Sequence, residues 1–271
     1  MPANLPVSVI MTVYNGEKYL WPALHSILEQ TKRPEECIFV EDNSSDSSGE
    51  ILQEFYTKHH DKMQIKIIQK GKLGRAKALS EAVIHATQPW IAVLDADDIW
   101  HPQKLELQME QLNHGEWAGL GTQAVVFSQA ADISQWILKR SQQVNVKPVE
   151  FKNLLFTNTL CHSSLIIRRE LACYDTSRSS QIDYDLLLKT AQKFRLGRIE
   201  CELTAHRIHP NQSFESKNRL KYSINSLTLQ AKYAIRSKHY ILLGTLLLKL
   251  GYYVIRNKWL FQKIHQVGRA R

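Results

Sequence analysis

Short apolar segments alternate with amphipathic segments along the first hundred residues, and this alternation constrains the fold more than any other feature. Strand-like segments occupy residues 7–14, 37–40, 65–68 and 90–94, and their centres lie about 27 residues apart. Between them, apolar residues recur at helical spacing. This is the spacing of βαβ units, which form a parallel sheet with right-handed crossovers. We therefore expect an α/β fold, with a mostly parallel sheet flanked by helices.

The segment after the first strand, residues 17–31, has the pattern of an amphipathic helix, with Leu20, Leu24 and Ile27 on one face. It also contains Pro22. Because proline lacks a backbone N–H and clashes with the preceding turn, a helix tolerates it only in its first turn. We therefore expect Pro22 to belong to the first turn of this helix.

The composition fits a globular protein. The chain has 271 residues, 44% of them hydrophobic, which is enough for one large domain or for one domain with an appendage. The first apolar run has no basic segment before it and no small-residue cleavage site after it, so it predicts a strand and not a signal peptide. None of the four cysteines is at CxxC spacing, which gives no support to a zinc cluster or a disulfide framework. We therefore expect a reducing, cytoplasmic setting.

The net charge of +9 is concentrated at the C-terminal end. No Asp or Glu follows Glu215, whereas twelve Lys and Arg do. The other 23 Lys and Arg stand against 26 Asp and Glu in residues 1–215, a net charge of −3. We therefore predict an α/β domain over 1–215 and a basic, partly amphipathic helical tail over 216–271.

Polar residues stand where the predicted strands end. Thr12 and Tyr14 end the first strand, and Glu41 and Asp42 end the second. In a parallel sheet, ligands bind beyond the carboxyl ends of the strands. These side chains are therefore expected to converge on one rim, together with the acidic residues after the fourth strand.

Three aspartates, Asp95, Asp97 and Asp98, follow the fourth strand within four positions. Clustered carboxylates repel one another unless a cation lies between them, and Mg²⁺ and Mn²⁺ take such oxygen ligands, often shared with a phosphate. A solvated turn of helix-capping residues is the alternative. A calcium-binding loop is excluded, because Ile99 and Trp100 stand where it needs an oxygen ligand and a glycine.

A series of motifs extends over residues 7 to about 213. In chain order they are VSVIMTVYNGEKYL, SILEQT, FVEDNSSD, LDADDIWHPQKL, SSLIIRRE, IDYDLLLKTA and RIHPNQS. In this order the motifs resemble those of the inverting glycosyltransferases of family 2, which have the GT-A (Rossmann-like) fold. The resemblance implies a nucleotide-sugar half over about 1–100, an acceptor half over about 101–215, and a divalent metal, Mn²⁺ or Mg²⁺, on the donor diphosphate.

The resemblance assigns donor-binding roles on the rim. Thr12 and Tyr14 match residues that line the nucleoside pocket, with strand-end packing as the alternative. Asp42 matches the aspartate that accepts a hydrogen bond from uracil N3–H, a role suited to a carboxylate. Its alternative is a helix cap, which Asp46 can provide instead. Arg75 matches a basic residue that faces the diphosphate, and its alternative is a solvated helix charge.

The same resemblance implies a metal site. Asp97 and Asp98 match the metal-facing end of the acidic motif, whereas Asp95 is expected to orient the loop or to contact the ribose or the sugar. His209 matches a histidine that in some relatives reaches the metal or the diphosphate, with a structural role as the alternative. His206 stands where a tyrosine is common and gives no further guidance.

Asp183 matches the catalytic base of the family. Inverting transfer needs a carboxylate that takes the proton from the attacking acceptor hydroxyl. Ile182 stands where the family usually has glutamate, which leaves Asp185 as a second candidate. The alternative for Asp183 is an acidic residue that favours the helix N-terminus.

Together these features predict a metal-dependent inverting glycosyltransferase. It would move a hexosyl or N-acetylhexosaminyl group from a nucleotide-sugar, expected to be a UDP-sugar, to a glycan or lipid-linked acceptor in surface polysaccharide or lipopolysaccharide biosynthesis. A catalytically inactive sugar-nucleotide-binding protein is the alternative, which Ile182 favours. The segment after the first strand lacks the Gly-rich loop of nucleotidyltransferases, and the absence of GxxxxGK[ST] excludes a P-loop NTPase.

The basic tail predicts attachment to a membrane surface. No uninterrupted apolar run in it reaches about 18 residues, which argues against a transmembrane helix. Lys249, Arg256 and Lys263 lie seven residues apart and form one stripe, with leucine and aromatic side chains largely elsewhere. We expect peripheral attachment at the cytoplasmic (inner) face of the cytoplasmic membrane. A helical hairpin packed on the domain is the alternative, and the long apolar runs argue against nucleic-acid binding.

Overall fold

The computed structural model describes residues 4–129, 133–139, 144–209 and 219–253. They form two compact units, one of residues 1–150 and 159–208 and the other of residues 151–158 and 209–271. The boundary predicted near residue 215 lies outside the described residues.

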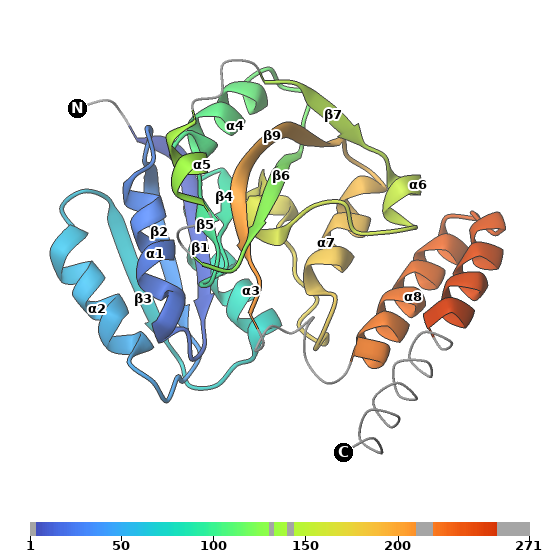
Figure 1. Cartoon of the computed structure of the whole chain (residues 1–271), viewed down its shortest axis with the longest axis horizontal. Helices are drawn as coiled ribbons and strands as arrows, with labels where there is room; N and C mark the ends of the chain where they lie inside the picture. Colours follow the sequence, from blue (N-terminus) through green and yellow to red (C-terminus); the bar gives the residue numbers. More distant parts are fainter. Residues whose placement is uncertain (1–3, 130–132, 140–143, 210–218, 254–271) are drawn as a thin grey trace, which may run out of the picture. The chain divides into compact units, whose positions relative to one another are not determined.

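The first half of the larger unit is a regular series of parallel strands and helices (Figure 1). Its four strands lie in the order β3-β2-β1-β4, and all three neighbouring pairs are parallel. Each strand overlaps a predicted one, so the expected βαβ arrangement is confirmed. The elements are β1 (Leu5–Val13), α1 (Glu17–Leu28), β2 (Pro34–Glu41), α2 (Ser48–His59), β3 (Gln64–Gln69), α3 (Arg75–His85) and β4 (Trp90–Val93).

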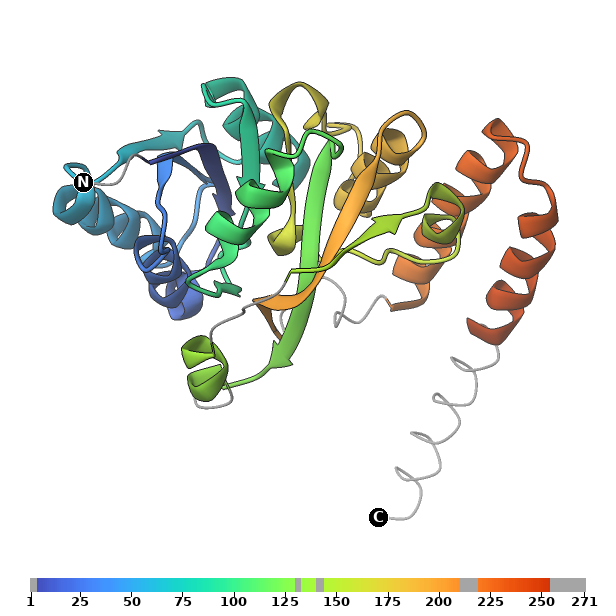
Figure 2. The same cartoon turned by 90° about the horizontal axis from the view of Figure 1, so that it is seen from above.

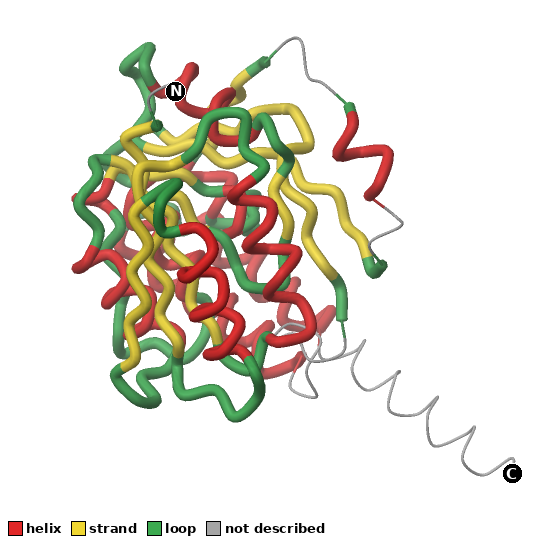
Figure 3. Tube along the Cα trace, turned by 90° about the vertical axis from the view of Figure 1, so that its left-hand side faces the viewer, coloured by secondary structure: helices red, strands yellow, loops and turns green. Residues whose placement is uncertain are grey.

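Alternate residues of the strands face opposite sides of this sheet, as the two-residue period of a strand requires. Val9, Met11 and Val13 of β1 belong to a buried apolar cluster that includes Leu24 of α1 and Phe55 of α2. Helix α3 packs against β1 and β2. In Figure 3 the strands, in yellow, run side by side, and the helices, in red, lie against them. The apolar strands are therefore buried, and only their ends are available for ligands.

Pro22 differs from the expectation. It is the sixth residue of α1 and lies in the second turn, so its predicted place in the first turn is wrong. The helix continues because one face, with Leu24 and Ile27, is completely buried. Lys18, whose carbonyl would otherwise accept the missing N–H, is exposed, so water can satisfy that oxygen.

The second half of this unit is a mixed sheet. Strand β8 is antiparallel to β4 and β6, β6 is parallel to β9, and β5 and β7 pair with β9 in antiparallel fashion. The long strand β9 is absent from the sequence-based expectation. The elements are β5 (Ile99–Trp100), α4 (Lys104–Leu112), β6 (Gly119–Phe127), α5 (Ser134–Leu138), β7 (Val146–Val149), the 3-10 turns η2 (His162–Ser164) and η3 (Arg169–Leu171), β8 (Ile166–Arg168), α7 (Ile182–Ala191) and β9 (Leu196–Arg207).

Strands β6 and β9 run side by side (Figure 2), but their register is interrupted. Thr122 pairs with Ile199, whereas the next residue, Gln123, pairs with Glu202. Two extra residues of β9 are accommodated at this step and a third at the next, where Ala124 pairs with Thr204, and such an irregularity is a β-bulge. Bulges bend a strand and re-aim its side chains, and they are frequent beside active sites.

The smaller unit is helical, as predicted for the tail. It contains α6 (Phe151–Leu154), α8 (Arg219–Arg236) and a further helix over 241–253. The carbonyl of Phe156 accepts hydrogen bonds from Gln230, at 2.8 Å, and from Lys249. Within the described residues, no helix is long and apolar enough to cross a membrane.

Candidate active site

The loops that follow β1 and β2 hold each other in place. The backbone N–H of Glu17, at the start of α1, donates to Asp46 at 3.0 Å, and Glu17 accepts the N–H of Ser47 at 3.0 Å. Asp46 also accepts the N–H of Ser48, the first residue of α2, at 3.0 Å. Asp46, in the loop before α2, thus provides an acceptor for an N–H at the start of α1, and Glu17 of α1 provides one for the N–H of Ser47 before α2. Asp46 serves as the cap for this pair of helices, which leaves Asp42 for another role.

Asp42 is buried and fixes the loop before α3. Its carboxylate accepts the backbone N–H groups of Leu73 and Gly74, the latter at 3.0 and 3.1 Å. Gly74 has φ +82°, a conformation that favours glycine, and Arg75 follows it as the first residue of α3. Asp42 therefore positions the start of α3, a task that the sequence does not reveal. Contact with uracil stays a prediction.

Tyr14 lies at the same rim and is half-exposed. The Lys72 ammonium lies 4.6 Å from the centre of the Tyr14 ring and donates a hydrogen bond of 3.1 Å to its hydroxyl. Thr12 is partly buried within β1, where it pairs with Val40. An aromatic ring beside a cation at a strand end offers a surface for a base or a phosphate. The roles of Thr12 and Tyr14 in the nucleoside pocket stay predictions.

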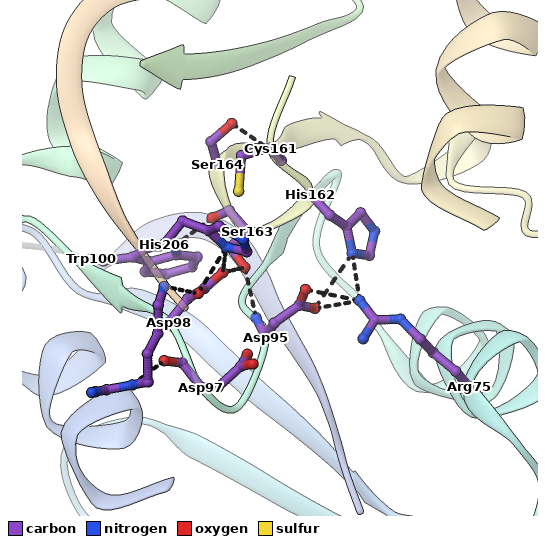
Figure 4. A network of polar contacts seen from close by, with 11 residues as sticks. Arg75, Asp95, Asp97, Asp98, Trp100, Cys161, His162, Ser163, Ser164 and His206 are labelled. Carbon is purple, nitrogen blue, oxygen red and sulfur yellow. Dashed lines mark hydrogen bonds and ion pairs between the residues drawn. The ribbon is translucent and has the colours of Figure 1, made fainter. Parts of the chain in front are cut away.

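The three aspartates after β4 lie close together (Figure 4). The N–H of Asp98 donates to the carbonyl of Asp95 at 3.1 Å, which closes the turn. One carboxylate oxygen from each of Asp95, Asp97 and Asp98 lies within 4.8 Å of the others. Asp97 is partly buried, and its carbonyl accepts a hydrogen bond of 2.9 Å from Arg207. The predicted carboxylate cluster is therefore present as one group that offers oxygen ligands.

Asp95 forms an ion pair with Arg75. The guanidinium donates to both carboxylate oxygens, at 2.7 and 2.8 Å, and His162 lies 3.4 Å from the same carboxylate. Burial alone would raise the pKa of Asp95, but the charge of Arg75 and the hydrogen bond from His162 hold that pKa well below its ordinary value. Arg75 is thus not a purely solvated helix charge. The pair places one fixed cation beside the acidic cluster.

Asp98 is completely buried and is the most heavily hydrogen-bonded member of the cluster. It accepts hydrogen bonds from the Ser163 hydroxyl, from the backbone N–H of Arg207 at 3.0 Å and from His206 Nδ1 at 3.1 Å. The hydrogen bond to Asp98, followed by one to Cys161, raises the pKa of His206 to about 11. Burial raises the pKa of Asp98, and the hydrogen bond from His206 opposes that rise.

His206 and Cys161 are site residues that sequence reasoning missed. With Asp98 they form a second group of possible metal ligands, again within 4.8 Å of one another. The two-residue strand β5 causes this arrangement, because its pairing of Ile99 with Ala205 brings the end of β9 to the acidic turn. His209 belongs to the other compact unit and to neither ligand group among the described residues, so its role at the metal stays a prediction.

Asp183 is the second residue of α7 and is partly buried. Its charge acts on Arg75 and Tyr174, so it belongs to the same cluster of polar side chains. Asp185 is only 1% exposed and is ion-paired with Lys189 at 2.6 Å. Ile182 is buried, as expected for an apolar residue at this position. Of the two carboxylates, Asp183 is therefore the one that an acceptor hydroxyl can reach more easily.

Comparison with known proteins identifies the family. The family model described as Glycosyl transferase family 2 matches residues 8–173. An uncharacterized glycosyltransferase of Methanocaldococcus jannaschii is 31% identical over 241 residues, which cover 86% of this chain and 81% of the relative. WfgD of Escherichia coli, named a UDP-Glc:alpha-D-GlcNAc-diphosphoundecaprenol beta-1,3-glucosyltransferase, is 25% identical over 216 residues, which cover 79% of this chain and 81% of that protein.

Solved structures show the same fold. TarS of S. aureus in complex with UDP superposes with a TM-score of 0.64 at 18% identity, over 85% of this chain and 66% of that one. The mannosyltransferase PcManGT from Pyrobaculum calidifontis, in complex with GDP-Man and Mn²⁺, gives a TM-score of 0.60 at 17% identity, over 95% of this chain and 72% of that one. Fold and site thus define a glycosyltransferase with the GT-A fold. The chain belongs to glycosyltransferase family 2.

Proposed function

We propose that this glycosyltransferase is metal-dependent and inverting, and that it transfers a hexosyl or N-acetylhexosaminyl group from a UDP-sugar to a lipid-linked or glycan acceptor. The observation that carries the proposal is the group of Asp95, Asp97 and Asp98, whose oxygens lie within 4.8 Å of one another beside the Asp95–Arg75 ion pair. An all-oxygen donor set suits Mg²⁺ or Mn²⁺. When bound, such an ion offsets charge on a departing diphosphate.

In this mechanism Asp97 and Asp98 would hold the metal, and Arg75 would direct its positive charge toward the diphosphate. Asp95 keeps the guanidinium in place through the two hydrogen bonds of 2.7 and 2.8 Å. Asp183 takes the proton of the acceptor hydroxyl as that oxygen attacks the anomeric carbon and the nucleoside diphosphate leaves. Hydrogen bonds and the Arg75–Asp95 ion pair hold Arg75, Asp95 and Asp98 in place before the substrates arrive, so little reorganisation of them is needed in the transition state.

Two relatives support a UDP-sugar donor, because TarS binds UDP and WfgD is named for UDP-Glc. PcManGT is instead bound to GDP-Man, so the choice of base depends on this chain's own nucleoside pocket at Thr12, Tyr14 and Asp42. The family's uracil contact maps to the buried carboxylate of Asp42, which favours UDP over GDP. The WfgD name also contains a diphosphoundecaprenol-linked acceptor, which supports a lipid-linked acceptor here.

The acceptor proposal also gives the helical tail a role. Several large apolar side chains of the helix over 241–253 are exposed, with Ile241 at 91%, Leu247 at 70% and Leu248 at 77%. No acidic residue follows Glu215. A basic segment with an exposed apolar stripe favours an anionic membrane surface. We propose peripheral attachment at the inner face of the cytoplasmic membrane, where a lipid-linked acceptor would be available.

A thermal-shift panel tests the proposed function directly. The protein is heated with UDP, GDP, UDP-glucose, UDP-N-acetylglucosamine or GDP-mannose, each with Mn²⁺, with Mg²⁺ or with EDTA. A ligand at 100 times its dissociation constant stabilises the folded state by about 2.7 kcal/mol. The donor class should therefore be identifiable from the rise in melting temperature. The expected result is stabilisation by UDP compounds that EDTA weakens. No stabilisation by any nucleotide, with either metal, would contradict the proposal.

A further inference from the structure

A polar cavity of about 290 Å³ lies between strands β6 and β9 and the segment that leads into η2. It is lined by Ala124 and by a set of side chains able to form hydrogen bonds. These are Thr122, Gln123, Thr159, Cys161, Arg198 and Glu202. The residues come from three separate parts of the chain, which the fold of the larger unit brings together.

The cavity lies at the bulge of β9. Regular pairing would place residue 200 opposite Gln123, but the bulge places Glu202 there instead. The change of register pairs Glu202 with Gln123, and both residues line the cavity. Bulges commonly re-aim a side chain toward a site, and this bulge belongs to the part of β9 that contributes Glu202 to the cavity.

The cavity adjoins the acidic cluster. Cys161, which lines it, has its Sγ within 4.8 Å of a carboxylate oxygen of Asp98 and of a ring nitrogen of His206. Figure 4 shows the Cys161 side chain beside His206, as this short distance requires. A ligand in the cavity would therefore lie next to the residues proposed to hold the donor.

The lining suits an uncharged, hydroxyl-rich ligand. In the part of the chain that the structure describes, the side chains of Gln123, Thr159 and Glu202 form no hydrogen bond, so their donors and acceptors are available. The positive charge of Arg198 is offset by Glu200, at 2.9 Å. The cavity therefore offers hydrogen-bond acceptors and donors without a surplus of positive charge, which favours a neutral sugar over a phosphate.

We propose that this cavity binds a neutral sugar ring of the acceptor, with Gln123 and Glu202 as residues that determine acceptor specificity. This inference rests on the proposed function, because it assumes that the adjoining acidic cluster holds the donor. Gln123 and Glu202 are expected to contact sugar hydroxyl or acetamido groups, and Ala124 limits the space available to the ring.

Binding of simple glycosides tests the inference without knowledge of the natural acceptor. Saturation-transfer difference NMR is recorded on the full chain with UDP and Mg²⁺ and with the methyl glycosides of glucose, galactose, mannose, N-acetylglucosamine and N-acetylgalactosamine. The wild type should bind at least one of them in the millimolar range. Gln123→Ala and Glu202→Ala should each weaken that binding about five- to tenfold, the loss of about one hydrogen bond.

Ala124→Trp fills the cavity and should abolish glycoside binding, whereas Val126→Trp, at an exposed position of the same strand, should not change it. In all variants the affinity for UDP should stay within twofold of the wild-type value. Failure of the wild type to bind any of the glycosides, or wild-type binding by Ala124→Trp, would overturn the inference. If the wild-type protein does not bind UDP, the proposed function is contradicted instead.

Discussion

Ser163 connects two of the three aspartates, and its hydroxyl provides the sharpest test of the site geometry. The side chain is completely buried. Its hydroxyl donates to the Asp98 carboxylate and accepts the backbone N–H of Asp95 at 3.1 Å. Ser163→Ala removes both interactions and leaves both partners in the protein interior.

The expected loss of stability follows from these two contacts. A hydrogen bond to a charged group contributes about 1.5–3 kcal/mol, and a buried N–H left without an acceptor costs about 1–3 kcal/mol. Because partial relaxation reduces the sum, Ser163→Ala should lower the free energy of unfolding by about 2–5 kcal/mol. Ser164→Ala is the matched control. Ser164 is also buried, but its hydroxyl donates only to the carbonyl of Cys161, at 2.7 Å, so about 1 kcal/mol is expected.

Urea denaturation in EDTA, followed by tryptophan fluorescence, measures the difference. Trp100 reports on this region because its indole N–H donates to the Ser163 carbonyl at 2.6 Å. A second measurement combines Ser163→Ala with Asp98→Asn, which should be non-additive by about 1 kcal/mol or more. If Ser163→Ala and Ser164→Ala differ by less than about 0.5 kcal/mol, the bridging role of Ser163 is refuted.

Four further predictions concern the proposed function. Asp97→Asn should abolish transfer and remove the metal dependence of UDP binding measured by calorimetry, and full wild-type activity in EDTA would contradict this. Asp183→Asn should reduce kcat by about 10²-fold or more with donor affinity unchanged, whereas an active Asp183→Asn beside an inactive Asp185→Asn would show that the base is misassigned. Asp42→Ala should weaken UDP binding more than GDP binding, and equal losses would reduce Asp42 to an anchor of the loop before α3. The full chain should co-sediment with vesicles that contain anionic lipid, less so at high salt, and truncation after residue 238 should abolish this; unchanged sedimentation of the truncated chain would refute a role for the removed helix.

The parallel half of the fold was predictable because its signals are local. The strand residues of β1 and the helical face of α1 each appear as regular runs in the sequence, and a single proline changes little when one face of a helix is buried. β9 gave no such signal, since Arg198, Glu200 and Glu202 interrupt its apolar residues. β5 has only two residues, and its existence depends on the pairing with β9.

The site was predictable to the extent that it depends on strand ends. The carboxylate cluster follows from the end of β4, and Asp183 from the start of a helix. The interactions of these residues are long-range and leave no local pattern. The Arg75–Asp95 pair spans 20 positions, and His206 lies 108 positions from Asp98. Of the two histidines in HRIHP, only tertiary structure shows that His206 contacts the acidic turn.

The division of the chain into units that interrupt each other has a consequence for biosynthesis. Residues 151–158 leave the ribosome long before Gln230 and Lys249, whose side chains bond to the carbonyl of Phe156 in the finished protein. At about 5–20 residues per second, the interval is roughly 5–20 s. During that time the nascent chain carries Leu154 and Leu155, both buried in the folded protein, in a segment whose partner helices have not yet been made. A translational pause or a stop codon within 160–230 would prolong that exposure. Residues 151–158 are therefore a segment to which chaperones that bind short apolar sequences would bind during synthesis.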